Sequence, residues 1–223
     1  ECTGKFVKEE DAMKHITAGA KHVIISAPAK GNVKTVVYGV NDDILEREDK
    51  IISSASCTTN CLAPVLKVIE DNIGIETGFM TTIHAYTNDQ NTLDGSHKKG
   101  INSRRGRTSA TNIVPTSTGA ASAIGLVIPS LSGKMDGVAY RVPVSDGSVV
   151  DVVLNLKRET SVDEINSLFK DNQSEVLEFT LDPVVSSDVI TSSKGALVDG
   201  LSTKVLSANQ RQIKVVAWYD NEY

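Results

Sequence analysis

A short apolar strand passes directly into an apolar helix at residues 50–66, KIISSASCTTNCLAPVL. The strand is predicted over 50–53, and the helix begins at Thr58 and ends before Gly74. Its apolar residues recur at helical spacing, at Leu62, Val65, Leu66 and Ile69. Cys57 is therefore expected at the junction of strand and helix, where the backbone N–H groups lack partners.

Helices and strands alternate before this junction. A helix is predicted over Lys8–Ala18, followed by strands at His22–Ser26 and Thr35–Val40. Because parallel strands need crossover connections, this alternation with short turns favours the end of a parallel α/β layer. The first part of the chain is therefore assigned to the α/β class.

The rest of the chain predicts a different architecture. Alternation over Gly78–Thr87 indicates a strand that carries His84 near its end. Val138–Val144 and Ser148–Leu156 are expected to pair as antiparallel strands around a Ser-Asp-Gly turn. The other predicted elements are helices at Gly119–Val127 and after Ser161, and a last strand at Ile213–Tyr219. This pattern favours an α+β unit with a largely antiparallel mixed sheet and flanking helices.

Composition indicates an ordinary globular chain of 223 residues, of which 40% are hydrophobic and 23% charged. The net charge of -5 argues against a nucleic-acid partner, and no apolar run reaches the length of a membrane span. No secretory leader is visible, which favours a cytoplasmic location. Three cysteines do not make a disulfide framework, so reduced thiols are expected. Because the sequence opens without methionine and stops at Tyr223, within a structured segment, we expect it to be an excerpt.

Cys57 is the first candidate for chemistry. A thiol on the first turn of a helix lies near unsatisfied N–H groups and the positive end of the helix dipole, which both favour the thiolate. Its pKa is therefore expected to fall from the reference value near ~8.5, and a drop of about two units would correspond to roughly 3 kcal/mol of thiolate stabilisation. Taken alone, Cys57 or His84 is more often a structural residue. However, the short polar residues from Ser56 to Cys61 exceed what one helix cap needs, which indicates a ligand site.

This junction resembles the active-site signature of phosphorylating glyceraldehyde-3-phosphate dehydrogenases, in which the first cysteine is the nucleophile. The matching run is SCTTNCLAP, residues 56–64. Further stretches are similar to the family in its own order, namely ECTG (1–4), SAP (26–28), YGVN (38–41), HAYTNDQ (84–90), NIVPTSTGAA (112–121), RVP (141–143) and WYDNE (218–222). The resemblance covers nearly the whole chain.

The resemblance implies that glyceraldehyde 3-phosphate is oxidised and phosphorylated to 1,3-bisphosphoglycerate, with NAD as the hydride acceptor, as in glycolysis. Cys57 would form a hemithioacetal and then a thioester, while His84 would act as the base. The substrate phosphate would be held by Thr87, Asp89 and Arg141. The attacking inorganic phosphate would be held by Ser56, Thr58, Thr118, Gly119 and Arg104.

A long basic loop is predicted over Asn88–Thr111, where periodicity is lost and RRGR occurs at 104–107. Such a charge run is often only a solvated face, and the family pattern is what selects Arg104. The loop is a few residues longer than in many relatives, so the choice of Arg104 over Arg105 depends on its register. Exposed N–H groups at Thr118-Gly119 suit an anion, and an ordinary threonine cap is the alternative.

The cofactor assignment also comes from the resemblance. No G-x-G-x-x-G turn for a dinucleotide occurs in this sequence. Residues 1–56 would be the C-terminal part of the NAD-binding domain, 57–220 the catalytic domain, and 221–223 the start of a segment that returns to the first domain. The residues expected near the nicotinamide are Ser26, Asn88 and Asn221. We expect the isolated chain to bind NAD weakly with little turnover, and the complete enzyme to be a homotetramer.

Three other functions are open at this stage. Erythrose-4-phosphate dehydrogenase shares the fold and the cysteine–histidine pair but releases an acid, and Thr118, Gly119 and Arg104 fit phosphate use better. A surface-exposed binding role has no leader or adhesive repeat to support it. A metal site built on Cys57, Cys61 and His84 has no fourth ligand at zinc-like spacing.

Overall fold

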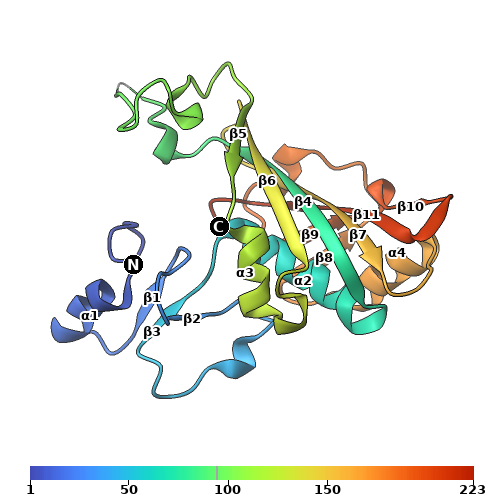
Figure 1. Cartoon of the computed structure of the whole chain (residues 1–223), viewed down its shortest axis with the longest axis horizontal. Coiled ribbons are helices and arrows are strands. Elements are labelled where there is room, and N and C mark those ends of the chain that lie inside the picture. The colour runs from blue at the N-terminus through green and yellow to red at the C-terminus, as the bar shows by residue number, and fades with distance from the viewer. Residues whose placement is uncertain (94) are drawn as a thin grey trace.

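A computed structural model of the chain describes residues 1–93 and 95–223; Asp94, in the loop expected at 88–111, lies outside the described residues. The chain forms a small sheet beside a larger one (Figure 1). The small sheet has three parallel strands in the order β1 (Val23–Ile25), β3 (Ile51–Ser53), β2 (Lys34–Thr35). Helix α1 (Glu9–Thr17) packs on it through the buried Ala12. The predicted parallel α/β layer is therefore confirmed.

The large sheet contains eight strands and is mixed. Its order is β5 (Val114–Ser117), β6 (Met135–Val142), β4 (Ile75–Ala85), β7 (Ser148–Leu156), β11 (Asn209–Tyr219), β9 (Ala196–Asp199) and β8 (Leu177–Thr180), with β10 (Lys204–Leu206) paired to β11. The pairs β4–β6 and β8–β9 are parallel, and the other pairs are antiparallel. The expected α+β unit with a largely antiparallel mixed sheet is confirmed.

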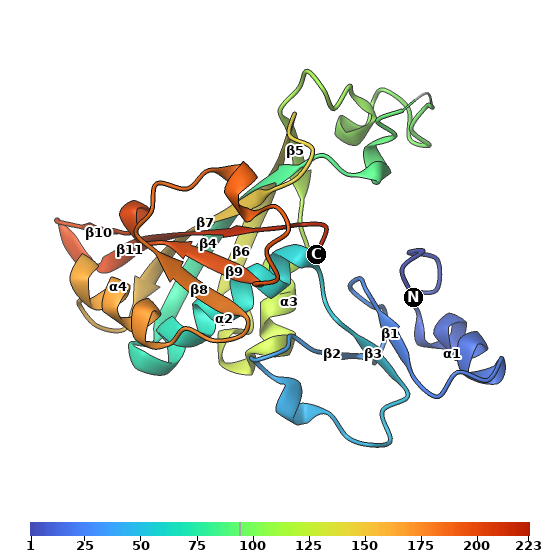
Figure 2. The same cartoon turned by 180° about the vertical axis from the view of Figure 1, so that it is seen from behind.

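Helix α2 (Cys57–Asn72) packs against the large sheet and forms the centre of the main core (Figure 2). The side chains that predicted its helical period are all 0% exposed: Leu62, Val65, Leu66 and Ile69. Burial of each stabilises the fold by about 2 kcal/mol. Helices α3 (Ala120–Val127) and α4 (Val162–Asp171) join the same core through Ile124 and Phe169. Apolar packing on three sides therefore fixes where α2 begins.

The predicted hairpin between Val138–Val144 and Ser148–Leu156 is wrong. Both strands exist, as β6 and β7, but β4 lies between them and pairs with each. The Ser-Asp-Gly turn therefore belongs to a connection that passes the end of β4, where Tyr86 N donates to Val144 O at 3.0 Å. The local turn pattern could not reveal an intervening strand, because strand order depends on which faces the core needs to bury.

Short elements account for the other differences. The strand expected at Thr35–Val40 ends at Thr35, because the side chain of Asn41 binds Val37 N at 2.8 Å and Gly39 turns the chain with a φ of 74°. Four short strands, β5, β8, β9 and β10, were not predicted. Each spans only three or four residues, which is too short to show a period by itself.

Gly147, which precedes β7, is expected to tolerate no side chain. Its φ is 84°, and a Cβ there would lie 2.2 Å from the backbone oxygen of Ser186. Gly133 has a similar φ of 74° but open space around it, so it is a matched control. We predict that Gly147→Ala lowers the free energy of unfolding by roughly 3 kcal/mol or more, and Gly133→Ala by about 1 kcal/mol. Urea unfolding of the two variants checks this, and equal losses would contradict it.

Candidate active site

Cys57 is the first residue of α2, and the turn before it is tightly held. Ala55 has a φ of 63°, a left-handed conformation that costs roughly 1–2 kcal/mol for an L residue. Ser53 Oγ accepts from Ala55 N at 3.1 Å, and Ser56 Oγ accepts from Thr59 N at 3.2 Å. The serine cap and the turn therefore present the half-buried thiol of Cys57 at the start of the helix.

His84 lies at the end of β4 and reaches this thiol. Its side chain is 4% exposed, and Nε2 lies 3.5 Å from Cys57 Sγ. Nδ1 lies 2.7 Å from the carbonyl oxygen of Ala85, which can only accept a hydrogen bond. Nδ1 therefore carries the proton, and Nε2 is left as an acceptor that faces the sulfur. Arg141 Nη1 also lies 3.3 Å from Nδ1, but two donors cannot bond to each other.

The predicted fall in the pKa of Cys57 is wrong for this structure. Burial raises the pKa of the thiol, and this outweighs the opposing hydrogen bonds from Thr58 and the charge of Arg141. Burial also lowers the pKa of His84 to about 4, and the nearby charge of Arg141 adds to that effect. The resting pair is therefore a neutral thiol against a neutral imidazole at pH 7, because both charged forms are disfavoured by desolvation.

An arginine lies directly beside this pair, because Arg141 on β6 is the register partner of His84 on β4. Arg141 Nη1 donates to Thr87 Oγ1 at 2.8 Å and to Ala85 O at 3.2 Å. Its Nε is buried and has no partner among the described residues. A buried guanidinium N–H without a partner fits an anionic oxygen. Three side chains expected at one phosphate come together here, because Thr87 also donates to Asp89.

The structure brings Arg105, and not Arg104, to this cluster. Arg105 forms an ion pair with Asp89, and its Nε donates to Thr116 Oγ1 at 2.8 Å. Burial raises the pKa of Asp89, but the hydrogen bond from Thr87 and the charge of Arg105 together hold it below its ordinary value. Arg104 is exposed on the same short turn. Side-chain direction within the turn separates the two arginines, and no sequence pattern encodes it.

The other side chains expected at the second phosphate are more dispersed. Ser56 Oγ lies 2.8 Å from Thr59 Oγ1, and the buried Thr58 Oγ1 lies 2.9 Å from the hydroxyl of Tyr219. Both hydroxyls therefore have partners within the protein. Thr118 Oγ1 accepts from Ala120 N at 3.2 Å, and Gly119 is exposed at the start of α3. Of Ser56, Thr58, Thr118 and Gly119, only the glycine is exposed to solvent, so its backbone is open.

The three residues expected near the nicotinamide come from different elements. Ser26 follows β1, is exposed and donates to Glu1 O at 3.2 Å. Asn88 is exposed on the turn after β4. Asn221 follows β11, and its Oδ1 accepts from Ser148 Oγ at 2.6 Å. Only Asn221 has a hydrogen bond that leads back to the strand of His84, because Ser148 also accepts from Ala85 N.

Two buried groups in this region were not found from the sequence. The hydroxyl of Tyr219 lies 2.9 Å from both Thr58 Oγ1 and Thr82 Oγ1, beneath the start of α2. Its ring packs edge-on against His84, with the centroids 6.0 Å apart. Ser148 is the second group, at the start of β7. Alternation placed these residues on strands, and although Tyr219 lies in the matching run WYDNE, neither residue was given a role in the site.

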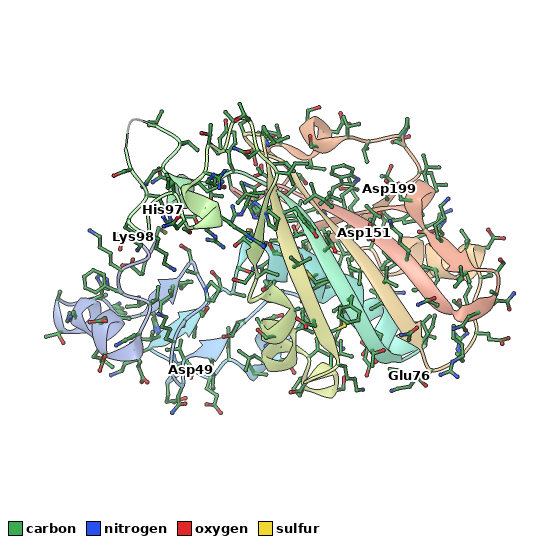
Figure 3. The ribbon with its side chains drawn as sticks, turned by 45° about the horizontal axis from the view of Figure 1, so that its top comes forward. Asp49, Glu76, His97, Lys98, Asp151 and Asp199 are labelled. Atoms are coloured by element: carbon green, nitrogen blue, oxygen red, sulfur yellow. The ribbon has the colours of Figure 1, made fainter. Side chains whose placement is uncertain are left out.

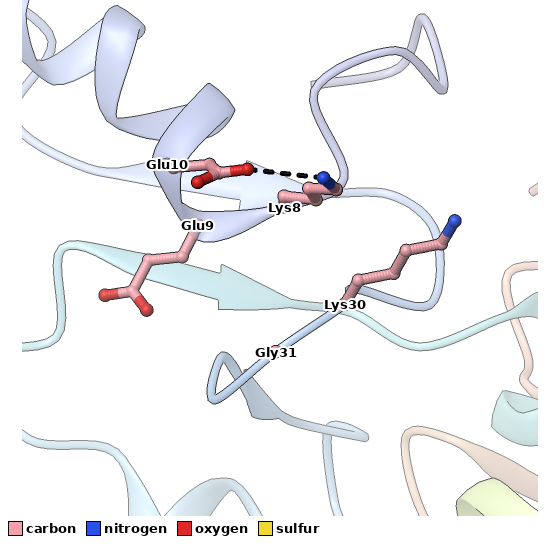
Figure 4. Close-up of a pocket in the computed structure, with 5 residues that line it drawn as sticks. All are labelled: Lys8, Glu9, Glu10, Lys30 and Gly31. Carbon is pink, nitrogen blue, oxygen red and sulfur yellow. Dashed lines mark hydrogen bonds and ion pairs between the residues drawn. The ribbon is translucent and has the colours of Figure 1, made fainter.

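A hollow beside α1 and the part of the basic loop around His97 lie outside this cluster of residues. The hollow is lined by Lys8, Glu9, Glu10, Lys30 and Gly31 (Figure 4). Within it, Lys8 and Glu10 form an exposed ion pair at 3.3 Å. The basic loop projects from the large sheet and carries His97 and Lys98 (Figure 3). Within residues 1–93 and 95–223, no three His, Cys, Asp or Glu side chains gather as metal ligands. Over the same residues, no helix has both the length and the apolar character needed to cross a bilayer.

A helix-start thiol, an acceptor imidazole and an arginine with a free N–H are typical of a cysteine-dependent enzyme that acts on an anionic substrate. Comparison with known proteins agrees with this class. Residues 56–221 match the family described as glyceraldehyde 3-phosphate dehydrogenase, C-terminal domain. The chain therefore belongs to the glyceraldehyde 3-phosphate dehydrogenase family.

Curated relatives align along the whole chain. It is 54% identical over 223 residues to a glyceraldehyde-3-phosphate dehydrogenase of Clostridium acetobutylicum, and 54% identical to that of Clostridium pasteurianum. It is 55% identical over 224 residues to a glyceraldehyde-3-phosphate dehydrogenase of Streptococcus pyogenes. All of the chain is covered in each comparison, but only 66% of each relative.

The depressed pKa of His84 predicts an acid-sensitive fold. Its pKa is about 4 in the folded chain against an ordinary 6.5, so the unfolded chain binds a proton that the folded chain refuses between these values. Stability from this group is present above about pH 6.5 and is lost as the pH falls towards 4, by about 3 kcal/mol. Urea unfolding of wild type and His84→Asn from pH 7 to 4 should show a flatter dependence in the variant.

Parallel pH dependences for wild type and His84→Asn would contradict the proposed cause.

Proposed function

We propose that this chain supplies the catalytic residues of a phosphorylating glyceraldehyde-3-phosphate dehydrogenase of glycolysis. The observation that carries the proposal is the 3.5 Å contact between Cys57 Sγ and the acceptor nitrogen of His84. The family membership and the 54–55% identity to relatives of that name support it. Because the chain spans less than two thirds of these relatives, the activity is assigned to a longer protein that carries it.

The first step is attack of Cys57 on the aldehyde carbon. Both partners are neutral at rest, so the proton of Sγ passes to His84 Nε2 as the S–C bond forms. The protonated imidazole then gives its proton to the carbonyl oxygen, which completes a hemithioacetal. The hydrogen bond from Nδ1 to Ala85 O holds the ring in position through both transfers. Because the Cys57 thiol and the His84 imidazole are both neutral at rest, the site buries no charge of its own on these two groups until the reaction begins.

Oxidation and phosphorylation follow at the same sulfur. His84 Nε2 takes the hydroxyl proton of the hemithioacetal as the C–H bond is lost as hydride, which leaves a thioester on Cys57. NAD, when bound, supplies the hydride acceptor, and Ser26, Asn88 and Asn221 would hold it; the side chain of Asn221 fits a carboxamide. An oxygen of inorganic phosphate attacks the thioester carbon, the S–C bond breaks and the acyl phosphate leaves. The released sulfur takes back the proton that His84 Nε2 holds, which restores the neutral pair.

Two anion-binding regions support a phosphorylated substrate and free phosphate. Arg141, whose Nε has no partner among the described residues, and Thr87 are proposed to receive the substrate phosphate, and the carboxylate of Asp89 is proposed to orient Thr87 by accepting from its hydroxyl. Arg105 and the open backbone at Thr118-Gly119 are proposed for the inorganic phosphate, with Ser56 and Thr58 at the helix start behind them. We put Arg105 in the place of Arg104, because its guanidinium contacts the strand that leads to Thr118.

Domain organisation and assembly are part of the same proposal. Residues 1–56 are assigned to a cofactor-binding domain, 57–220 to the catalytic domain, and 221–223 to a returning segment. A homotetramer is supported by the face of the large sheet away from α2, where Phe79 is 69% exposed and lies opposite Val153. An apolar pair in the middle of a sheet face indicates a surface that another copy covers.

Cys57→Ser should abolish phosphate-dependent NADH formation by the full-length enzyme, with a loss of roughly 10³-fold or more, because a hydroxyl is a far weaker nucleophile than a thiol. Cys61→Ser on the same helix is the matched control. Cys61 is buried and its Sγ faces Ala217 O at 3.8 Å, so a serine can donate there and activity should persist. NADH absorbance with and without phosphate measures both.

NADH formation that does not depend on phosphate would favour erythrose-4-phosphate dehydrogenase instead. Activity that survives in Cys57→Ser would remove the assignment of the nucleophile.

The two loop arginines allow a second test. Arg105→Leu should raise the KM for phosphate by roughly tenfold or more, because a charged hydrogen bond to an anion is lost. Arg104→Leu removes the same charge from the same turn and should change KM much less. Steady-state kinetics with varied phosphate compares the two. A larger effect of Arg104→Leu would restore the residue that the family pattern selected.

A further inference from the structure

Ser148, at the start of β7, joins two parts of the site that no motif connects. Its side chain is buried, and the residue is 1% exposed. Oγ lies 3.0 Å from Ala85 N and 2.6 Å from Asn221 Oδ1. The amide N–H of Ala85 must donate, so the single hydroxyl hydrogen of Ser148 is free to donate only to Asn221. An acceptor at that position of Asn221 is therefore favoured, because it pairs the buried hydroxyl hydrogen.

The hydrogen bond from Ser148 determines which way the side-chain amide of Asn221 points. Oδ1 faces Ser148, and Nδ2 turns to the exposed side, 3.3 Å from Glu222 Oε1. A flipped amide would make Ser148 Oγ accept from both Ala85 N and Asn221 Nδ2, and the buried hydroxyl hydrogen would lose the partner that Asn221 Oδ1 now gives it. Ser148 thus decides that Asn221 presents its N–H donors outward.

The same hydroxyl holds the backbone N–H of Ala85, the residue whose carbonyl group orients His84; that carbonyl belongs to the next peptide unit. The ladder between β4 and β7 ends at the pair Ile83–Val149, so Ala85 N has no backbone acceptor on β7 in that register. Ser148 Oγ takes that place, while Ala85 O accepts from His84 Nδ1 at 2.7 Å. Two hydrogen bonds therefore link Asn221 through Ser148 to the N–H of Ala85, and the covalent backbone of Ala85 leads on to the carbonyl that His84 meets.

We propose that Ser148 is a positioning residue that sets the tautomer of His84 and the amide direction of Asn221 together. The part that concerns His84 depends only on this chain. The part that concerns Asn221 rests on the proposed function, because it requires that Asn221 meet the carboxamide of a nicotinamide cofactor. Because this one hydroxyl binds both Ala85 at the end of β4 and Asn221 after β11, the positions of these two strand ends depend on each other.

The first test needs no catalysis. In ¹⁵N NMR of the imidazole, wild-type His84 is expected to be the Nδ1–H tautomer, and Ser148→Ala should give a mixture as the Ala85 peptide loses its anchor. The rate of Cys57 alkylation by iodoacetamide should fall roughly tenfold in Ser148→Ala. Ser148→Thr keeps the hydroxyl and should restore both readouts. An unchanged tautomer and alkylation rate in Ser148→Ala would overturn the proposal.

The second test uses the full-length enzyme. Ser148→Ala should raise the KM for NAD about tenfold and lower kcat, while the KM for phosphate stays constant. If Ser148 acts through Asn221, the KM for NAD of the double variant with Asn221→Ala equals that of Asn221→Ala alone. Additive effects would overturn the coupling between the two residues.

The outcomes separate the two proposals. A wild-type enzyme that forms no NADH with phosphate refutes the proposed function, while the tautomer and alkylation results still decide the role of Ser148. If Ser148→Ala does not fold, Ser148→Cys replaces the hydroxyl by a weak donor, and the same two readouts should shift in the same direction.

Discussion

The contact between Cys57 Sγ and His84 Nε2 exists because α2 packs across the large sheet that contains β4. This single contact cannot align the two elements, because Cys57 starts a helix and His84 ends a strand 27 positions later in the chain. Burial of the apolar face of α2 sets the height and direction of its first turn over the sheet. The site is therefore a consequence of the core, and side chains such as Leu62 and Leu66, which touch no substrate, determine its geometry.

Burial also determines the electrostatics of the site. Burial raises the pKa of the Cys57 thiol against the hydrogen bonds from Thr58 and the charge of Arg141, and it lowers the pKa of His84. Polar atoms in this region form linked hydrogen bonds. The hydroxyl of Tyr219 bonds to two threonine hydroxyls, and the backbone of Ala85 bonds to both His84 and Ser148. Such a network limits the orientations available to the buried imidazole, and it leaves one acceptor nitrogen directed at the sulfur.

Local signals were sufficient where a long periodic segment or a cap existed. The period of α2 and the alternation that carries His84 predicted the two elements and the side of each that is buried. The resemblance added the set around Arg141, whose members do meet in space. Local signals failed for strand order, since β4 separates β6 from β7, and they could not show that Arg105, and not the adjacent Arg104, pairs with Asp89. Neither difference leaves a trace in spacing or composition.

The sequence by itself determined the longer helices and strands and the candidate residues Cys57 and His84, because period, capping and residue type act over a few neighbours. Tertiary structure alone decided strand order, the protonation of Cys57 and His84, the arginine that joins the anion cluster, and the link through Ser148. These depend on burial and on contacts between residues far apart in the chain. Desolvation and hydrogen-bond direction are properties of the packed core, and they arise only after the segments have come together.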